Sequence, residues 1–228
     1  DSVEIAMNVD APVKLVWTRE EDMQHDYYRP ATYNLFEAGL DKAGKPVAWN
    51  HRVVAPPLSR RGGPNSLDRS SVNGASNLPY DIPNIFVDYC RSDIPVPVGY
   101  WRSVGPSQNT FITESFIDEV AYAAGKDPFE YRKKLLKKQP RLLNVLELAA
   151  EKSGWGGKLP KGYARGIAVV EDKGSFCAQV AEISIEKQQV QIHRVTCALD
   201  CGQVIHPGIV ESQTVGSVVY GLSAALYG

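Results

Sequence analysis

Residues 97–125 restrict the fold of this chain most, because a proline- and glycine-containing loop runs directly into an amphipathic helix. Gly99 and Gly105 allow the backbone to lie close to a ligand, in conformations that other residues avoid. The helix is expected to begin near residues 108–110, so that its unpaired N–H groups and positive dipole end face the loop. The stretch therefore predicts an anion pocket where the loop meets the helix.

Two side chains of the loop support this pocket. Trp101 offers a flat surface, and Arg102 offers a cationic fork that suits oxyanions. The alternative is an ordinary surface loop in which Arg102 pairs with a neighbouring carboxylate, because helix starts with glycines and one arginine are common. The residues of the loop leave both interpretations open.

The composition is that of an ordinary globular protein, with 228 residues, 43% of them hydrophobic and 22% charged. The net charge of −1 gives no electrostatic reason to expect a nucleic-acid partner. Residues 214–228, the longest uncharged apolar run, fall short of the roughly 20 residues that a membrane span requires. We therefore expect no membrane span and predict a buried helix there.

The four cysteines lack disulfide-framework spacing and are expected to be buried thiols.

Turn residues divide the first half of the chain into β-rich runs. The short connection 41–45 contains glycine, so residues 32–40 and 46–54 should form an antiparallel hairpin. Residues 56–83 are rich in proline, glycine, serine and asparagine and predict a long binding loop, lid or partner contact, with disorder as the alternative. The other strands predicted in this half are 13–19 and 85–94.

Three helices should follow. Apolar residues recur at helical spacing over residues 111–124, with acidic residues such as Glu114 on the opposite side. The dipeptide Asp127-Pro128 supplies an N-cap and a first-turn proline for a second helix. A third helix should span residues 140–153 and stop at Gly154.

The last part of the chain predicts strands followed by one more helix. The second and third of these strands should form a hairpin, with a bulge near residues 193–194 where the apolar positions change parity. The fold class is therefore α+β, with mixed or antiparallel sheets and packed helices. We expect two portions, 1–157 and 158–228, the second consisting of a β-hairpin and a C-terminal buried helix. The predicted elements of the second portion are strands 165–172, 175–186 and 189–200 and a helical run over 208–228.

The segment from Asp200 to Pro207 repeats the design of the first loop, because a glycine-containing turn and a proline precede a helix whose first turns carry the amide of Gln213. Two such elements can converge on one ligand. Gln213 can donate and accept, as recognition of a heterocycle edge requires, or it can cap its own helix.

A zinc site is the other interpretation of this region, because two histidines and two cysteines follow one another. Extended residues advance about 3.3 Å each, so side chains four positions apart lie too far apart to share an ion bound at about 2.3 Å. The spacing therefore argues against zinc unless the strand breaks early. The four residues are His193, Cys197, Cys201 and His206.

The two loop–helix blocks resemble the molybdenum-binding large subunit of the xanthine dehydrogenase and aldehyde oxidase family, and within it the isoquinoline 1-oxidoreductase beta-subunit type. PVGYWRSVGPSQNTFITESFIDEVA stands where the family has its arginine-glycine loop and a glutamine before a helix. ALDCGQVIHPGIVESQTVGSVVYGLSAALYG is similar to its D-x-G-x-x-(N/H)-P…Q-x-x-G helix, and WTREEDMQHDYYRPATY also looks like this branch. The resemblance covers essentially the whole chain.

This resemblance implies two subdomains of a molybdopterin-binding domain. It implies oxidative hydroxylation of an aldehyde or nitrogen heterocycle, with water-derived oxygen and a molybdenum-pterin cofactor, and with electrons passed to an iron–sulfur subunit or domain. Val104 would stand on the substrate side, where relatives have an aromatic residue. The residues that would bind the cofactor are Trp101, Arg102, Ser103, Gln108 and Gln213.

The family's glycine-rich cofactor loop is expected before residue 1, and its catalytic glutamate after Gly228. We therefore expect no catalytic residue and no metal ligand in this chain, no cofactor bound to the chain alone, and dependence on the remaining parts of the large subunit. A non-enzymatic α+β scaffold or subunit-contact domain is the alternative, and a zinc-stabilised binding module is a third hypothesis. Neither the periplasm nor the cytoplasm is favoured.

Overall fold

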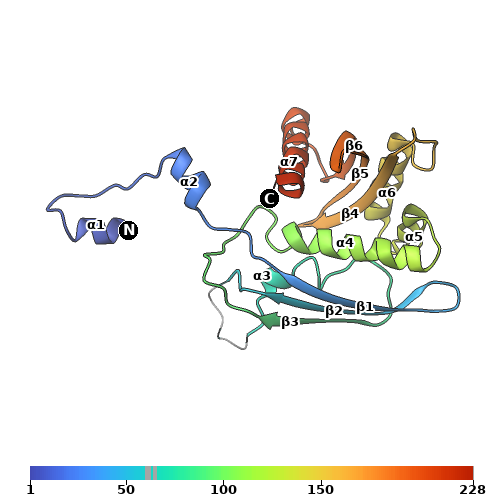
Figure 1. Cartoon of the computed structure of the whole chain (residues 1–228), viewed down its shortest axis with the longest axis horizontal. Helices are drawn as coiled ribbons and strands as arrows, with labels where there is room; N and C mark the ends of the chain where they lie inside the picture. The colour runs from blue at the N-terminus through green and yellow to red at the C-terminus, as the bar shows by residue number, and fades with distance from the viewer. Residues whose placement is uncertain (60–62, 64–65, 228) are drawn as a thin grey trace.

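The computed structural model describes residues 1–59, 63 and 66–227. It contains two three-stranded sheets, ordered β1-β2-β3 and β4-β5-β6. Helices α4 and α5 lie over one face of the first sheet, next to the second sheet (Figure 1). The elements are α1 (Ser2–Ala6), α2 (Arg19–His25), β1 (Tyr33–Leu40), β2 (Pro46–Ala55), α3 (Arg69–Val72), β3 (Ile85–Arg91), α4 (Pro106–Ala123), α5 (Pro128–Leu135), α6 (Pro140–Ser153), β4 (Tyr163–Asp172), β5 (Ser175–Glu186), β6 (Gln189–Asp200) and α7 (Pro207–Tyr227).

One continuous hydrophobic core joins the two sheets. Trp49 of β2, Ile117 of α4, Leu142 of α6 and Val180 of β5 all belong to it, and each is at most 2% exposed. The two portions of the chain are therefore packed together through the helices rather than held by a linker alone. The α+β class with mixed and antiparallel sheets is confirmed.

Both predicted hairpins are confirmed. Strands β1 and β2 pair antiparallel around the turn at Asp41, whose carboxylate accepts the N–H groups of Ala43 and Lys45. Strands β5 and β6 also pair antiparallel, and their register shifts so that Arg194 faces Glu182 while Ile192 faces Ile183. Residue 193 is left between them, so the predicted bulge is confirmed.

The predicted N-cap of α5 and the predicted end of α6 are also confirmed. Asp127 caps α5 by accepting the N–H groups of Phe129 and Glu130. Gly154 ends α6 in the left-handed conformation, with φ of 69°, which glycine adopts without steric cost.

Several elements differ from the sequence predictions, and strand β3 ends at Arg91 and not at residue 94. Residues 13–18 form no strand, because the chain there lies outside both sheets and finds no pairing partner. Helix α4 begins at Pro106, since proline suits a first helical turn, and not at residues 108–110. The loop 56–83 contains the short helix α3, capped by Asp68; residues 60–62 and 64–65 of this loop lie outside the described part.

The predicted faces of α4 were wrong in part. Phe111 is 74% exposed, whereas Glu114 is only 6% exposed. The carboxylate of Glu114 accepts hydrogen bonds from the Tyr80 hydroxyl, the Arg132 Nε and the backbone N–H of Val169. These partners come from three separate segments, so helical spacing could not identify the buried acid.

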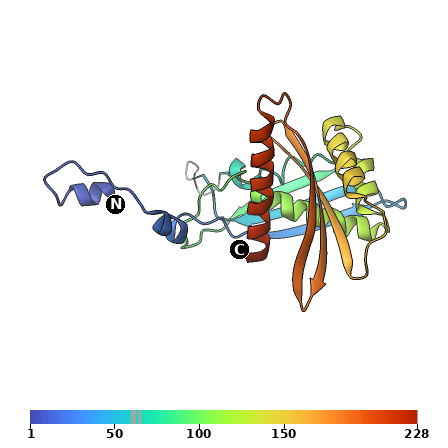
Figure 2. The ribbon, with the colours of Figure 1, turned by 90° about the horizontal axis from the view of Figure 1, so that it is seen from above.

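The prediction of a buried C-terminal helix was also wrong. Helix α7 contains no buried residue within the described chain, and Val215 and Val219 are each 58% exposed. It lies beside the second sheet, on the side opposite α6, while the N-terminal segment extends away from both sheets (Figure 2). Apolar composition predicted burial, but no described segment covers the outer side of α7.

The thiols differ from the prediction as well. All four cysteines are free, yet Cys90 is exposed and the other three are partly exposed.

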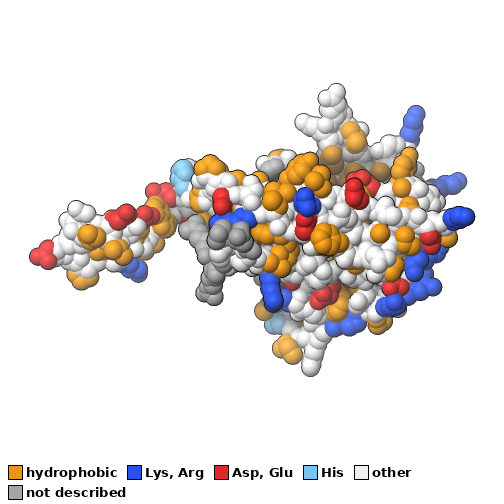
Figure 3. Space-filling model, turned by 90° about the horizontal axis from the view of Figure 1, so that it is seen from below, with side chains coloured by type: hydrophobic (Ala, Val, Ile, Leu, Met, Phe, Trp, Pro, Cys, Tyr) orange, Lys and Arg blue, Asp and Glu red, His pale blue; other side chains and the backbone are white. Residues whose placement is uncertain are grey.

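Figure 3 shows the molecule from the side of the first sheet, where hydrophobic side chains are interspersed with charged ones. No helix in the described part of the chain combines the length and apolar character needed to span a bilayer.

Candidate cofactor-side site

The loop before α4 is attached to the N-terminal segment. Tyr28 and Val98 form a parallel bridge, and the N–H of Gly99 donates to the carbonyl oxygen of Tyr28 at 3.1 Å. A Cβ added to Gly99 would lie 2.8 Å from the Cβ of Tyr27. The close approach predicted at Gly99 is therefore an approach to the chain's own N-terminal segment and not to a ligand.

Trp101 joins this loop to α7. Its Nε1–H donates to the carbonyl oxygen of Tyr27 at 3.3 Å, and its ring centroid lies 5.8 Å from that of Tyr220. The guanidinium of Arg29 lies 5.7 Å from the indole centroid. Because an α-helix has about 3.6 residues per turn, Gln213 lies on the same side of α7 as Tyr220, two turns earlier. The structure thus brings the two predicted loop–helix blocks to one side of the molecule.

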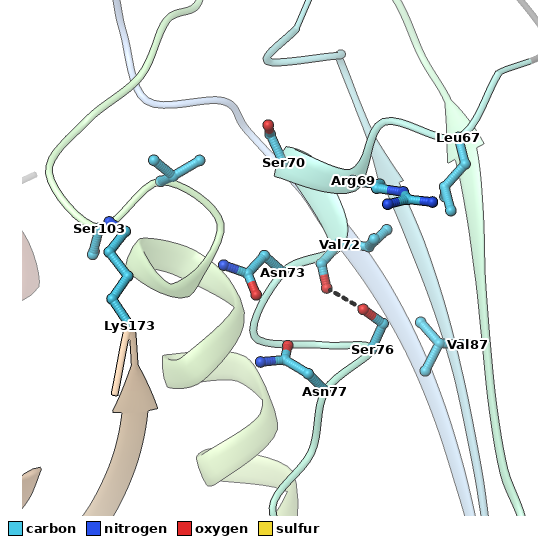
Figure 4. A pocket seen from close by; sticks show the side chains of 11 residues that line it. Leu67, Arg69, Ser70, Val72, Asn73, Ser76, Asn77, Val87, Ser103 and Lys173 are labelled. Atoms are coloured by element: carbon cyan, nitrogen blue, oxygen red, sulfur yellow. Dashed lines mark hydrogen bonds between the residues drawn. The ribbon is translucent and has the colours of Figure 1, made fainter. Parts of the chain in front are cut away.

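Ser103 and Val104 have unusual backbones, with φ of 71° and 57°. Left-handed conformations are costly for residues other than glycine, especially β-branched ones, and they cluster at ligand-binding sites. Both residues line a pocket of about 550 Å³. Figure 4 shows Ser103 and Lys173 on one side of this pocket and Arg69, Leu67 and Val87 on the other.

Gly105 holds this strained turn against α3. A Cβ at this position would collide with the carbonyl oxygens of Ser70 and Asn73, the second at 2.5 Å. The amide side chain of Asn109 donates to the same segment, to the carbonyl oxygens of Ser71 and Asn73. Gly105 is therefore required by protein packing rather than by a ligand.

The prediction that the start of α4 offers free N–H groups was wrong. The N–H of Ser107 donates to Val104, and those of Gln108 and Asn109 donate to Gly105. Pro106 has no N–H to offer. The N–H groups of the three residues after it already have acceptors within the chain, so they are not free to bind an anion.

Gln108 is a buried polar residue of this site whose side chain has no partner among the described residues. Its side chain is 5% exposed, and within the described structure neither Nε2 nor Oε1 has a hydrogen-bond partner. The Oδ1 of the adjacent Asn109 is also buried and unpaired. A buried polar atom without a partner costs about 1–3 kcal/mol, so this pair of amides is suited to a group that supplies both a donor and an acceptor.

The remaining predicted residues are open to solvent. Arg102 and Gln213 are exposed, and neither makes a hydrogen bond or ion pair with any residue that the structure describes. The surface-loop alternative, in which Arg102 pairs with a neighbouring carboxylate, thus has no contact to support it. Gln213 likewise does not cap α7.

The turn before α7 is fixed by a charge pair. Arg141 of α6 donates from Nε and Nη2 to the carboxylate of Asp200 at 2.8 and 2.7 Å, and the N–H of Gly202 donates to the same carboxylate. The hydrogen bonds from Arg141 lower the pKa of Asp200 to about 2. Asp200 therefore positions the turn that leads to Gln213.

The residues considered for zinc are separated. His193 Nε2 lies 2.8 Å from Ser184 Oγ and the ring stacks on Tyr163, whereas Cys197 contacts Cys177. Across residues 1–59, 63 and 66–227, no cluster of three or more histidine, cysteine or acidic side chains could hold a metal ion.

Sequence reasoning missed several residues of the site. Asn109, which lies next to Gln108 and bonds the α3 segment, carries no motif of its own. Neither does Arg69 in the pocket lining, and Lys173 of the same lining comes from the β4–β5 turn, far away in sequence. Neither turn motifs nor helical spacing give a signal for such residues, because their positions depend on how the two sheets pack.

Two family models identify the class of protein. Each is described as a molybdopterin cofactor-binding domain, and they match residues 3–136 and 153–228. This chain belongs to the family of molybdopterin cofactor-binding domains, whose cofactor is a molybdenum pterin.

Individual relatives show which oxidoreductase subunits the chain is similar to. The chain is 30% identical over 99% of its length to the beta subunit of isoquinoline 1-oxidoreductase from Brevundimonas diminuta, and 27% identical over 99% of its length to a nicotinate dehydrogenase subunit from Pseudomonas putida. It spans only 30% and 21% of these relatives. The named relatives are thus oxidoreductase subunits that are more than three times as long.

A solved structure supports the fold. Quinoline 2-oxidoreductase from Pseudomonas putida 86 superposes with a TM-score of 0.52 and 17% identity, over 68% of this chain and 23% of that one. At this identity, the likeness shows the arrangement of helices and sheets alone.

The described residues fit the family's cofactor. The buried Gln108 amide has a donor and an acceptor that are both free within the described structure. Recognition of a heterocycle edge requires such a pair. Trp101 and Ser103 lie in the same loop, and Tyr220 connects this loop to α7.

Proposed function

We propose that this chain forms one wall of the cofactor site in a molybdenum hydroxylase that oxidatively hydroxylates an aldehyde or nitrogen heterocycle with water-derived oxygen. The observation that carries the proposal is the buried, unpaired amide of Gln108 at the start of α4. When bound, the molybdenum-pterin cofactor supplies the two-electron redox chemistry.

In this proposal, the residues of this chain bind and orient the cofactor. Gln108 and Gln213 donate and accept at polar edges of the cofactor, and the flat ring of Trp101 packs against it. Arg102, exposed and without a partner among the described residues, contributes its guanidinium to an oxyanion. Ser103, kept in a left-handed conformation by the surrounding turn, lines the pocket beside Val104.

Val104 is proposed to face the substrate. It lines the pocket of about 550 Å³, and the apolar Leu67 and Val87 line the same pocket. A smaller aliphatic side chain here leaves room for a bulkier substrate, so replacing Val104 with phenylalanine should lower kcat/KM for bicyclic heterocycles more than for small aldehydes.

The proton-removing base is proposed to come from another part of the large subunit. The buried carboxylate on α4, Glu114, is occupied on both oxygens by Tyr80, Arg132 and Val169. A base requires a free lone pair within reach of the proton it removes. We therefore propose that the isolated chain is inactive and that residues 1–157 and 158–228 work as two portions of a larger active site.

Electrons are proposed to leave through an iron–sulfur subunit or domain, since the cofactor must be reoxidised after each turnover. The alternative function is a non-enzymatic scaffold or subunit-contact domain, which the exposed apolar side chains of α7 favour. The two hypotheses differ in whether Gln108 matters for cofactor content.

The test compares Gln108→Leu with Gln189→Leu in the large subunit expressed with its partner subunit. Gln189 is exposed at the start of β6, so its replacement controls for the loss of an amide. We expect Gln108→Leu to lower the molybdenum and pterin content at least tenfold, with dehydrogenase activity toward aldehydes or azaarenes falling in parallel. Full cofactor content in Gln108→Leu would reject the assigned role of Gln108, and absence of molybdenum from the unmutated protein would support the scaffold.

A further inference from the structure

The hairpin of β5 and β6 carries two thiols in contact. Cys177 Sγ and Cys197 Sγ lie 3.5 Å apart. Cys177 faces Leu199 and Cys197 faces Gln179 across the strands, so the two cysteines are diagonal neighbours. Side chains of diagonal neighbours lie on one face of a sheet and reach each other.

This face is turned away from the core. The next residues along each strand, Ala178 and Ala198, are buried at 0% and 5% exposure, and successive side chains of a strand point to opposite faces. Cys177 and Cys197 are both partly exposed. Small reagents therefore have access to the pair without unfolding of the hairpin.

The local interactions divide the two thiols into different roles. A hydrogen bond from Cys177 lowers the pKa of Cys197, while the same interaction and burial raise the pKa of Cys177. The side-chain amide of Gln179 lies 3.9 Å from Cys177 Sγ. Because the thiolate is the nucleophile in thiol–disulfide exchange, Cys197 is suited to attack first.

We propose that Cys177 and Cys197 form a redox-active dithiol that low-molecular-weight disulfides oxidise to a cross-strand disulfide. The Cys197 thiolate attacks one sulfur of the reagent, forming a mixed disulfide and releasing one reagent thiolate. Cys177 then loses its proton to solvent and attacks Cys197 Sγ, releasing the second reagent thiolate. Two protein thiols are oxidised and one reagent disulfide is reduced to two thiols.

The geometry requires a small movement. A disulfide bond is about 2.05 Å long, so the sulfur atoms must approach each other by roughly 1.5 Å. The cysteines are diagonal neighbours on adjacent, hydrogen-bonded strands. Diagonal neighbours lie about 7–8 Å apart in a regular ladder, and a disulfide spans at most about 7 Å between Cα atoms, so closing the bond also requires a small local shift of the two strands. The bond would fasten β5 to β6, the strand that leads to α7.

Glutathione disulfide is the probe that tests this proposal on the full, pre-reduced chain. We expect peptide mapping of the denatured protein to recover Cys177 linked to Cys197, whether or not the exposed Cys90 also takes up glutathione. Retention of all four thiols, or a disulfide that joins either residue to Cys90 or Cys201 instead, would overturn the proposal.

Three variants separate the roles. Cys177→Ser should accumulate a glutathione mixed disulfide on Cys197, since the resolving thiol is absent, and Cys197→Ser should react more slowly at Cys177. Cys90→Ser should still form the internal disulfide at the unmutated rate, because Cys90 lies on β3 in the other sheet. Equal reaction at all positions would contradict the assigned order of attack.

Discussion

The rings of Trp101 and Tyr220 lie 5.8 Å apart, centroid to centroid. The first belongs to the loop before α4 and the second to α7, so this contact connects the two blocks on which the family resemblance depends. It also places Gln213 on the loop-facing side of α7. The proximity of the two blocks is a property of the fold.

The Trp101–Tyr220 contact should be measurable as a coupling energy. Aromatic pairs of this kind contribute about 0.5–1.5 kcal/mol beyond burial. A double-mutant cycle of Trp101→Leu and Tyr220→Leu, followed by urea unfolding, should give a coupling in this range. Combining Trp101→Leu with Tyr163→Leu provides the control, because Tyr163 stacks on His193 instead; its effects should be additive. Additivity in the first cycle would show that α7 does not rest on the loop.

Replacing Gly105 with alanine should damage the loop. The new methyl group would overlap the carbonyl oxygens of Ser70 and Asn73, and forced repacking of this kind costs about 1–3 kcal/mol or more. Gly166→Ala is the matched control, since nothing lies within 4 Å of its Cβ position. Thermal unfolding should show a clearly lower Tm for Gly105→Ala alone. A similar Tm for both variants would mean that the contact between this loop and α3 is not maintained.

Arg132→Met should be strongly destabilising, because it leaves the Glu114 carboxylate buried without its cation. Arg132 is 0% exposed and lies 3.0 Å from Glu114, and removing one partner of a buried pair costs about 3–5 kcal/mol. Lys133→Met is the control. Lys133 pairs with Glu147 at 42% exposure on each side, where a pair contributes no more than about 1 kcal/mol. Equal free energies of unfolding for the two variants would contradict the role of the buried pair.

His51 should make the stability depend on pH. Burial lowers the pKa of His51 to about 4 in the folded protein, from 6.5. The unfolded chain therefore binds the proton first as the pH falls, so the contribution of His51 is complete above pH 6.5 and is lost as the pH approaches 4. At about 1.4 kcal/mol per pKa unit, we expect a loss of about 3 kcal/mol across this window.

Replacing His51 with glutamine tests this assignment. Glutamine can still donate to Asn34 Oδ1, which lies 2.8 Å from His51 Nε2, but it does not titrate. Urea unfolding between about pH 7 and pH 4 should therefore show a smaller loss in His51→Gln than in the unmutated chain. An identical pH dependence in both proteins would assign the effect to other groups.

Local sequence determined much of this structure. The turn at Asp41, the cap at Asp127, the stop at Gly154 and the bulge at residue 193 were all predicted from the sequence. Each depends on interactions within a few residues, or on the side-chain parity of a strand, so the sequence near each position was sufficient.

Tertiary structure alone decided the rest. Gly99 and Gly105 were predicted to make room for a ligand, but they make room for Tyr27 and for the backbone of α3. Glu114 was placed on the outer side of its helix, but its partners Tyr80 and Arg132 make burial possible. These outcomes depend on which distant segments the two sheets bring together, and such contacts leave no periodic signal in the sequence, because their energies arise only once the core has packed.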